Sequence, residues 1–140
     1  MIQTTIFMPI FVLVGFSYVI AAMMLKERIH AVKGGLQPGY FLYNRGGKPP
    51  ESMLKVSHHY ENLFELPVLF YVVCISLYAT AHVNPLNLTL AWAFVLSRFA
   101  HAYIHIGKNR LLQRRNIFLL SSVVLLCMWV EFMLGLEFFI

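Results

Sequence analysis

Four apolar stretches, each about as long as a lipid bilayer is thick, constrain this chain more than any other feature. They run over residues about 6–25, 63–81, 86–106 and 117–139. A helix of about 20 mainly apolar residues crosses the hydrocarbon core. Backbone polar groups in lipid must be satisfied within the segment, so the stretches are predicted to be helices and not strands. The expected fold class is therefore all-α, a membrane-embedded four-helix bundle forming a single domain over residues 1–140.

The composition excludes a soluble domain of this size. Hydrophobic residues make up 59% of the 140 residues and charged residues 12%, and the mean hydropathy is +0.69. An ordinary globular domain is roughly 45–50% apolar and about 25% charged, and small domains leave much of their surface in water. The net charge of +5 is therefore interpreted as loops that face anionic lipids. Membrane lipids are expected partners, and nucleic acid is not.

The basic residues predict the orientation of a multi-pass integral membrane protein. The connection over about 26–57 and the one before the last stretch are rich in Lys and Arg, whereas the connection around 82–85 has neither. Cytoplasmic loops carry the excess of Lys and Arg, so both basic loops are expected in the cytoplasm and both termini outside. Glycine and proline between 34 and 50 predict turns. Pro67 is predicted to kink the second stretch, because proline removes a helical hydrogen bond.

Two ionisable residues within the apolar stretches indicate where a functional site lies. Glu65 and Arg98 each cost about 2.5–3.5 kcal/mol to place at bilayer depth, so such residues are usually functional. At 1.5 Å per residue, Glu65 is expected roughly 12 Å and Arg98 roughly 15 Å from the cytoplasmic ends of their helices. The two side chains then have similar depths on antiparallel neighbours, and an ion pair between them is geometrically possible.

Other polar residues share the expected faces of these two helices. Asn62 lies one turn before Glu65, and His58 lies four residues before Asn62. His101 and His105 follow Arg98 at i+3 and i+7, which is one helical stripe. The pattern predicts a mainly basic cleft that opens to the cytoplasm, where further arginines cap it: Arg110, Arg114 and Arg115.

The positive charge expected in this cleft suits a small anionic ligand, and glutathione fits on chemical grounds. Its two carboxylates pair with arginine or lysine, and its ammonium group pairs with a carboxylate such as Glu65. Cations near its thiol would lower the thiol pKa and populate the nucleophilic thiolate. Apolar walls would admit a small apolar electrophile from the bilayer, and holding the two reactants together would promote conjugation.

Two motifs in the second and third stretches carry a family resemblance. Asn62-Leu63-Phe64-Glu65 followed by Pro67 resembles an N-x-x-E pattern with a proline just after it. Arg98-Phe99-Ala100-His101, followed by Gly107-Lys108, resembles an R-x-x-H pattern. Together they resemble a divergent, bacterial-type member of the MAPEG family, the membrane-associated proteins in eicosanoid and glutathione metabolism. The resemblance covers nearly the whole chain.

The resemblance implies a homotrimer with sites between protomers near the cytoplasmic side. It implies that Asn62, Glu65 and Arg98 bind glutathione or support its site. Arg114 is similar to the family arginine associated with thiol activation and is the expected catalytic residue. Lys26 or Arg28 is similar to a carboxylate-binding arginine. The expected substrate-binding set is completed by His58, His101, His105 and Arg110, of which His58 and His105 stand where the family usually has arginine and tyrosine.

The function expected from the residues and the resemblance is that of a glutathione-dependent transferase or peroxidase acting on lipophilic electrophiles, with glutathione as co-substrate. Two alternatives stay open. One is a non-catalytic lipid-binding or scaffold trimer of the same fold, because a fold does not fix a function. The other is a histidine-based metal-binding membrane protein, since His101 and His105 have i, i+4 spacing and His58, His59 and Glu65 lie nearby. No H-E-x-x-H motif and no aspartate is present, so no metal is expected.

Overall fold

The computed structural model describes residues 2–136, which fold into helices without a strand. A short 3-10 helix (Ile2–Ile6) leads into α1 (Phe7–Lys33), and α2 is a single turn (Tyr40–Tyr43). Four longer helices follow: α3 (Glu51–Asn62), α4 (Leu66–Ala79), α5 (Pro85–Ile106) and α6 (Leu111–Gly135). The predicted all-helical fold is therefore confirmed for this part of the chain. Residues 137–139, the last three of the fourth expected stretch, lie outside the described residues.

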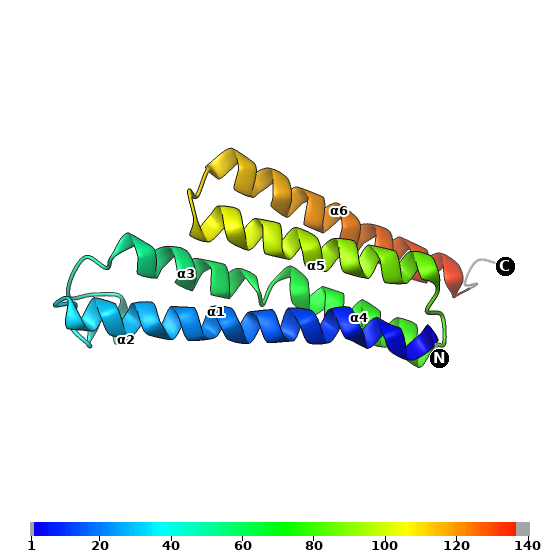
Figure 1. Ribbon diagram of the computed structural model, residues 1–140, viewed down its shortest axis with the longest axis horizontal. Coiled ribbons are helices and arrows are strands. Elements are labelled where there is room, and N and C mark those ends of the chain that lie inside the picture. Colours follow the sequence, from blue (N-terminus) through cyan, green and yellow to red (C-terminus); the bar gives the residue numbers. More distant parts are fainter. Residues whose placement is uncertain (1, 137–140) are drawn as a thin grey trace.

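The helices are arranged as long antiparallel rods (Figure 1). α1 runs the length of the bundle, α3 and α4 follow one another along it, and α5 and α6 form a hairpin against them. The start of α1 and the end of α6 lie at one end of the bundle. The connections that follow α1 and α5 both lie toward the other end, so the two basic connections share one end of the molecule.

Three helical stretches are long and apolar enough to cross a membrane: Gln3–Lys33, Glu51–Ala79 and Leu111–Gly135. Many of their large apolar side chains are exposed, as on a surface that lipid covers. α5 covers the expected third stretch with 22 residues but is not among these three stretches.

The connection expected over 26–57 is shorter than the sequence indicated. Residues 26–33 continue α1 and residues 51–57 belong to α3, so the irregular part is 34–50. The reason is local, because no glycine or proline lies between 26 and 33. The chain leaves α1 at Gly34 and Gly35, and Gly35 has φ +101°, a conformation that favours glycine. The predicted turns therefore occupy only the segment that contains the glycines and prolines.

The second expected stretch, 63–81, corresponds to α4, and a break separates it from α3, which precedes it along the bundle. α3 ends at Asn62 and α4 begins at Leu66, with Pro67 in its first turn. Proline is tolerated there because the first backbone N–H groups of a helix have no helical acceptor. The predicted disruption at Pro67 is confirmed. It also places Glu65 before the start of a new helix, off the face of α3 that carries Asn62.

Aromatic and aliphatic side chains fill the core between α1, α4, α5 and α6. The rings of Phe70 and Phe94 are fully buried and stack with centroids 4.6 Å apart. Ser97 and Ser121 join α5 to α6 by a buried hydrogen bond of 2.7 Å. This packing fixes α5 against α6, and α5 carries most of the buried polar residues of the bundle.

Candidate functional site

The break between α3 and α4 creates the polar centre of the bundle. The last carbonyl groups of a helix lack helical partners, and the Arg98 guanidinium donates from Nη2 to the Asn62 carbonyl oxygen at 3.3 Å. Arg98 is 0% exposed, and its Nε and Nη1 atoms have no hydrogen-bond partner among the described residues. A buried guanidinium thus reaches across from α5 to the end of α3 with most of its donors unused.

The buried acid expected beside Arg98 is absent. Glu65 is exposed and lies outside ion-pair distance of Arg98. The helix break is the cause, because Glu65 precedes α4 in a non-helical conformation instead of continuing the stripe of Asn62. Within residues 2–136 the ion pair that forms joins Lys55 to Glu51, on the surface of α3. Arg98 therefore has no direct anionic partner in the described part of the chain.

Four of the expected site residues meet at one cavity of about 400 Å³. Asn62 and Glu65 come from the helix break, His101 from α5 and Arg114 from the first turn of α6. Its remaining walls are one further arginine and three apolar side chains: Arg115, Leu111, Leu112 and Phe118. We call this the Arg114 cavity. Its volume lies within the range of small-molecule sites, roughly 300–1,000 Å³.

Arg114 is held beside the cavity by one group from the end of α5 and one from the connection that follows it. Its Nη1 atom donates to Asn109 Oδ1 at 3.0 Å and lies 3.2 Å from His105 Nε2. Arginine has no acceptor atom, so His105 Nε2 accepts this hydrogen bond and the ring is neutral with its proton on Nδ1. His105 is buried, and it therefore orients the guanidinium from below the cavity.

A third buried histidine, expected near His101 and His105 only in the metal-binding alternative, completes a cluster. The ring of His59 lies 5.4 Å from that of His101 and 5.4 Å from that of His105, between centroids. His101 and His105 are themselves 5.6 Å apart. His59 is 0% exposed and neither of its ring nitrogens has a hydrogen-bond partner among the described residues. We call His59, His101 and His105 the histidine cluster.

His59 takes the place at which His58 was expected. His58 is exposed and faces a different cavity, because the buried line of α3 passes through Val56, His59 and Leu63. Val56 and Leu63 flank His59 at the i, i+3, i+7 spacing of one helix face, and this spacing could have predicted that His59 is buried. Within residues 2–136, no group of three histidine, cysteine, aspartate or glutamate residues is arranged to hold a metal ion.

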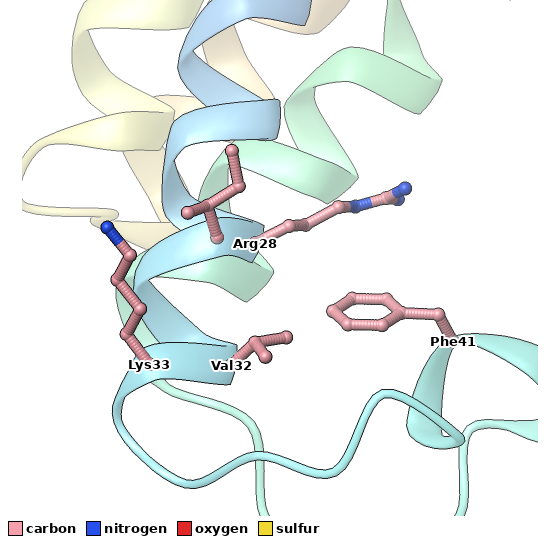
Figure 2. Close-up of a pocket in the computed structure, with 5 residues that line it drawn as sticks. Arg28, Val32, Lys33 and Phe41 are labelled. Atoms are coloured by element: carbon pink, nitrogen blue, oxygen red, sulfur yellow. The ribbon is translucent and has the colours of Figure 1, made fainter.

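The remaining expected residues lie away from the Arg114 cavity in this single chain. Arg28 stacks over Phe41 at 5.6 Å and lines two other cavities, one of them with His58. Figure 2 shows Arg28, with Phe41 below it, near the end of α1. Lys26 lines a groove on α1, and Arg110 is exposed just before α6. The structure thus unites Asn62, Glu65, His101 and Arg114, with Arg98 and His105 close by, and separates the others.

The Arg114 cavity has the chemistry of a receptor for a ligand with net negative charge. It offers two guanidinium groups, an imidazole and an amide against one exposed carboxylate. Guanidinium groups bind carboxylates in a bidentate manner, and the single Glu65 carboxylate suits an ammonium group. Leu111, Leu112 and Phe118 provide an apolar side beside these polar groups.

Comparisons with known proteins identify the family to which this arrangement belongs. Searches of the curated proteins and of the solved structures gave no match. A family comparison matches residues 6–134, nearly the whole chain, to the MAPEG family. The matched range includes the helix break, all of α5 and the first turns of α6, where the candidate site lies. The chain belongs to the MAPEG family.

Proposed function

We propose that the protein is a glutathione-dependent transferase or peroxidase that acts on lipophilic electrophiles in the membrane. The observation that carries the proposal is the Arg114 cavity, where Asn62, Glu65, His101 and Arg114 meet beside the buried Arg98. Family membership supports the proposal, because the resemblance of this sequence to its family implies glutathione chemistry. No metal is part of it.

The cavity supplies a role for each group in such a reaction. The glutathione carboxylates bind guanidinium groups, and the ammonium group faces Glu65. Arg114 stabilises the thiolate, since a neighbouring cation lowers the pKa of a thiol. The thiol proton passes to solvent, the sulfur forms a bond to the electrophilic carbon, and the leaving group departs with its electron pair. In the peroxidase reaction, two glutathione molecules become the disulfide while a hydroperoxide becomes an alcohol and water.

The proposal includes four membrane spans, namely the three apolar helical stretches given above and α5. The 22 residues of α5 are long enough to cross the hydrocarbon core. Arg98 and the buried histidines face the protein interior, which is where polar residues of membrane spans lie. The positive-inside rule then places the two basic connections in the cytoplasm and both termini outside.

A homotrimer is the assembly we propose, on the strength of the family resemblance. Exposed apolar side chains on α1, α4 and α6 leave ample surface for either lipid or neighbouring protomers. In such an assembly the Arg114 cavity, which is open on one side, would acquire a wall from the next protomer. Chemical cross-linking in detergent, with and without denaturant, would show whether trimers form.

Two measurements on purified protein in detergent test the proposed function. Calorimetric titration with glutathione should show saturable binding, and chlorodinitrobenzene should be conjugated. Arg114→Gln should still bind glutathione but lose most of the conjugation rate and the ultraviolet absorbance of the thiolate. Lys108→Gln, an exposed cation on the same connection, is the matched control.

The outcomes separate the proposal from its alternative. Absence of binding at millimolar glutathione contradicts the proposal. Binding without conjugation of any electrophile, and without a thiolate signal, supports the non-catalytic trimer instead. Equal loss of rate in Arg114→Gln and Lys108→Gln removes the assigned role of Arg114, because general surface charge would then explain the effect.

A further inference from the structure

The end of α1 extends beyond the hydrocarbon layer. α1 has 27 residues and is therefore about 40 Å long at 1.5 Å per residue, whereas the hydrocarbon core is about 30 Å thick. The part from Phe7 to Leu25 has no charged residue and accounts for roughly that thickness. The last two turns of α1, from Lys26 to Lys33, then lie at the level of the lipid headgroups.

Cations and exposed apolar side chains alternate on these two turns. Two adjoining grooves, of about 380 Å³ and 360 Å³, share Ile29 and Lys33. Leu25, Ile29 and Val32 remain exposed beside them. We call the combined surface the α1 basic groove, and its lining residues are Ala22, Leu25, Lys26, Arg28, Ile29, His30, Val32, Lys33 and Phe41. Apolar side chains bordered by cations are complementary to an amphipathic lipid with an anionic headgroup.

The α2 turn forms an aromatic wall on one side of this groove. Figure 2 shows Phe41 on α2 opposite Val32, with Arg28 above and Lys33 on the far side of α1. Arg28 lies over the Phe41 ring at 5.6 Å, so its guanidinium is oriented by a cation–π contact. The neighbouring Leu42 and Tyr43 are 74% and 78% exposed. Exposed aromatic side chains at headgroup depth are typical of membrane anchors.

The cations of the groove outnumber the one acidic residue on the same two turns, Glu27, and none of them is in an ion pair within residues 2–136. No acidic residue lines either groove. Lys26, Arg28 and Lys33 form no ion pair with any residue from 2 to 136. The Nε atom of Arg28 is buried without a hydrogen-bond partner there. Three cations spread over the last two turns of α1 are therefore available to an anion from outside.

We infer that the α1 basic groove binds an anionic phospholipid. The phosphate pairs with the cations of the rim, and the glycerol and upper methylene groups lie against Leu25, Ile29 and Val32. This site is distinct from the Arg114 cavity and needs no glutathione. It assigns to Lys26 and Arg28 a ligand different from the one expected from the sequence.

Native mass spectrometry of the detergent-purified protein tests the inference directly. Phosphatidylglycerol and phosphatidylcholine with the same acyl chains are titrated against the wild-type protein, and bound lipid is counted. We expect retained phosphatidylglycerol and little phosphatidylcholine. The double variant Lys26→Gln/Lys33→Gln should bind phosphatidylglycerol about thirtyfold more weakly, which corresponds to about 2 kcal/mol at about 1 kcal/mol per cation near the membrane surface.

The matched control is Arg45→Gln/Lys48→Gln, which removes the same charge from exposed positions of the same connection outside the groove. It should bind phosphatidylglycerol as the wild type does. Equal weakening in both double variants would overturn the inference in favour of nonspecific surface charge. Equal binding of the two lipids by the wild type would overturn it without reference to any variant.

A further arm separates lipid from free phosphate. Millimolar inorganic phosphate should not displace bound phosphatidylglycerol, because it lacks the apolar part that lies against Ile29 and Val32. Efficient displacement would identify a phosphate site and overturn the assignment to lipid. Lipid counts are independent of thiol chemistry, so failure of this inference and failure of the proposed glutathione function are read from different measurements.

Discussion

Replacing Arg98 with methionine should leave the ligand-free protein at least as stable as the wild type. The guanidinium is 0% exposed and makes one hydrogen bond, to the Asn62 carbonyl oxygen at 3.3 Å. Its Nε and Nη1 atoms lack partners, and no carboxylate of residues 2–136 lies within ion-pair distance. Glu65 acts on Arg98 electrostatically only from beyond ion-pair distance, so the buried charge is incompletely compensated, and apolar replacements of buried charged groups are often neutral or stabilising.

The magnitude follows from two opposing terms. Removing the uncompensated cation is expected to stabilise the fold by about 1–4 kcal/mol. Losing the hydrogen bond to Asn62 costs about 1 kcal/mol. The net effect lies between no change and a gain of about 3 kcal/mol, which raises Tm by up to roughly 12 °C if a chain of this length gains about 4 °C per kcal/mol.

Thermal unfolding followed by circular dichroism, in one detergent and without glutathione, measures this effect. Arg98→Lys is the matched variant, because it keeps the charge and loses the planar fork, and it should show no gain. Arg98→Met should also bind glutathione about 10- to 100-fold more weakly, as expected for loss of a charged hydrogen bond. Destabilisation of Arg98→Met by more than about 2 kcal/mol would refute the reasoning, since it would mean that the folded protein already compensates the charge.

Three further substitutions test other parts of the structure by the same thermal assay. His59→Leu should stabilise the protein by about 1–2 kcal/mol, because a buried imidazole with unpartnered nitrogens is replaced by an apolar side chain; a loss of stability would show that His59 has a partner. Phe70→Ala should destabilise it by about 3–5 kcal/mol, since the ring is buried against Phe94; a change below about 1 kcal/mol would contradict the packing. Asn84→Ala should cost about 1–2 kcal/mol, because its side chain caps α5 and bonds to Glu131 at 2.6 Å; an unchanged Tm would exclude that role.

The helical fold could be predicted because its causes are local. Apolar stretches of the right length indicate helices in lipid, and α5 starts and ends within one residue of the expected range. Pro67 disrupts its helix as predicted, since the missing N–H is a property of the residue itself. α1 continues to Lys33, beyond the expected end near residue 25, because the apolar stretch ends at the first lysine and the helix does not. A charged residue ends the contact with hydrocarbon, but it does not end a helix.

The candidate site could be predicted only in part, because a helix break and the packing of α3 change which residues share a face. Counting residues along one continuous helix placed His58, Asn62 and Glu65 on a single face. The break at 63–65 leaves Glu65 exposed and beyond ion-pair distance of Arg98, and the packing of α3 buries His59 in place of His58. On α5, which is unbroken, the stripe of Arg98, His101 and His105 is buried as a unit. Helical spacing is reliable within one helix and fails across an interruption.

The distribution of charge connects the candidate site with the α1 basic groove. The chain has 11 lysines and arginines against 6 acidic residues, yet one ion pair forms among residues 2–136. Unpaired cations lie inside the bundle at Arg98, at the Arg114 cavity and on the rim at the end of α1, and others lie on the exposed connections. Like charges at these places repel one another unless anions are supplied from outside. A membrane protein that leaves cations unpaired both in its interior and at headgroup level is therefore suited to anionic ligands at both depths, a small soluble one within and a lipid at the rim.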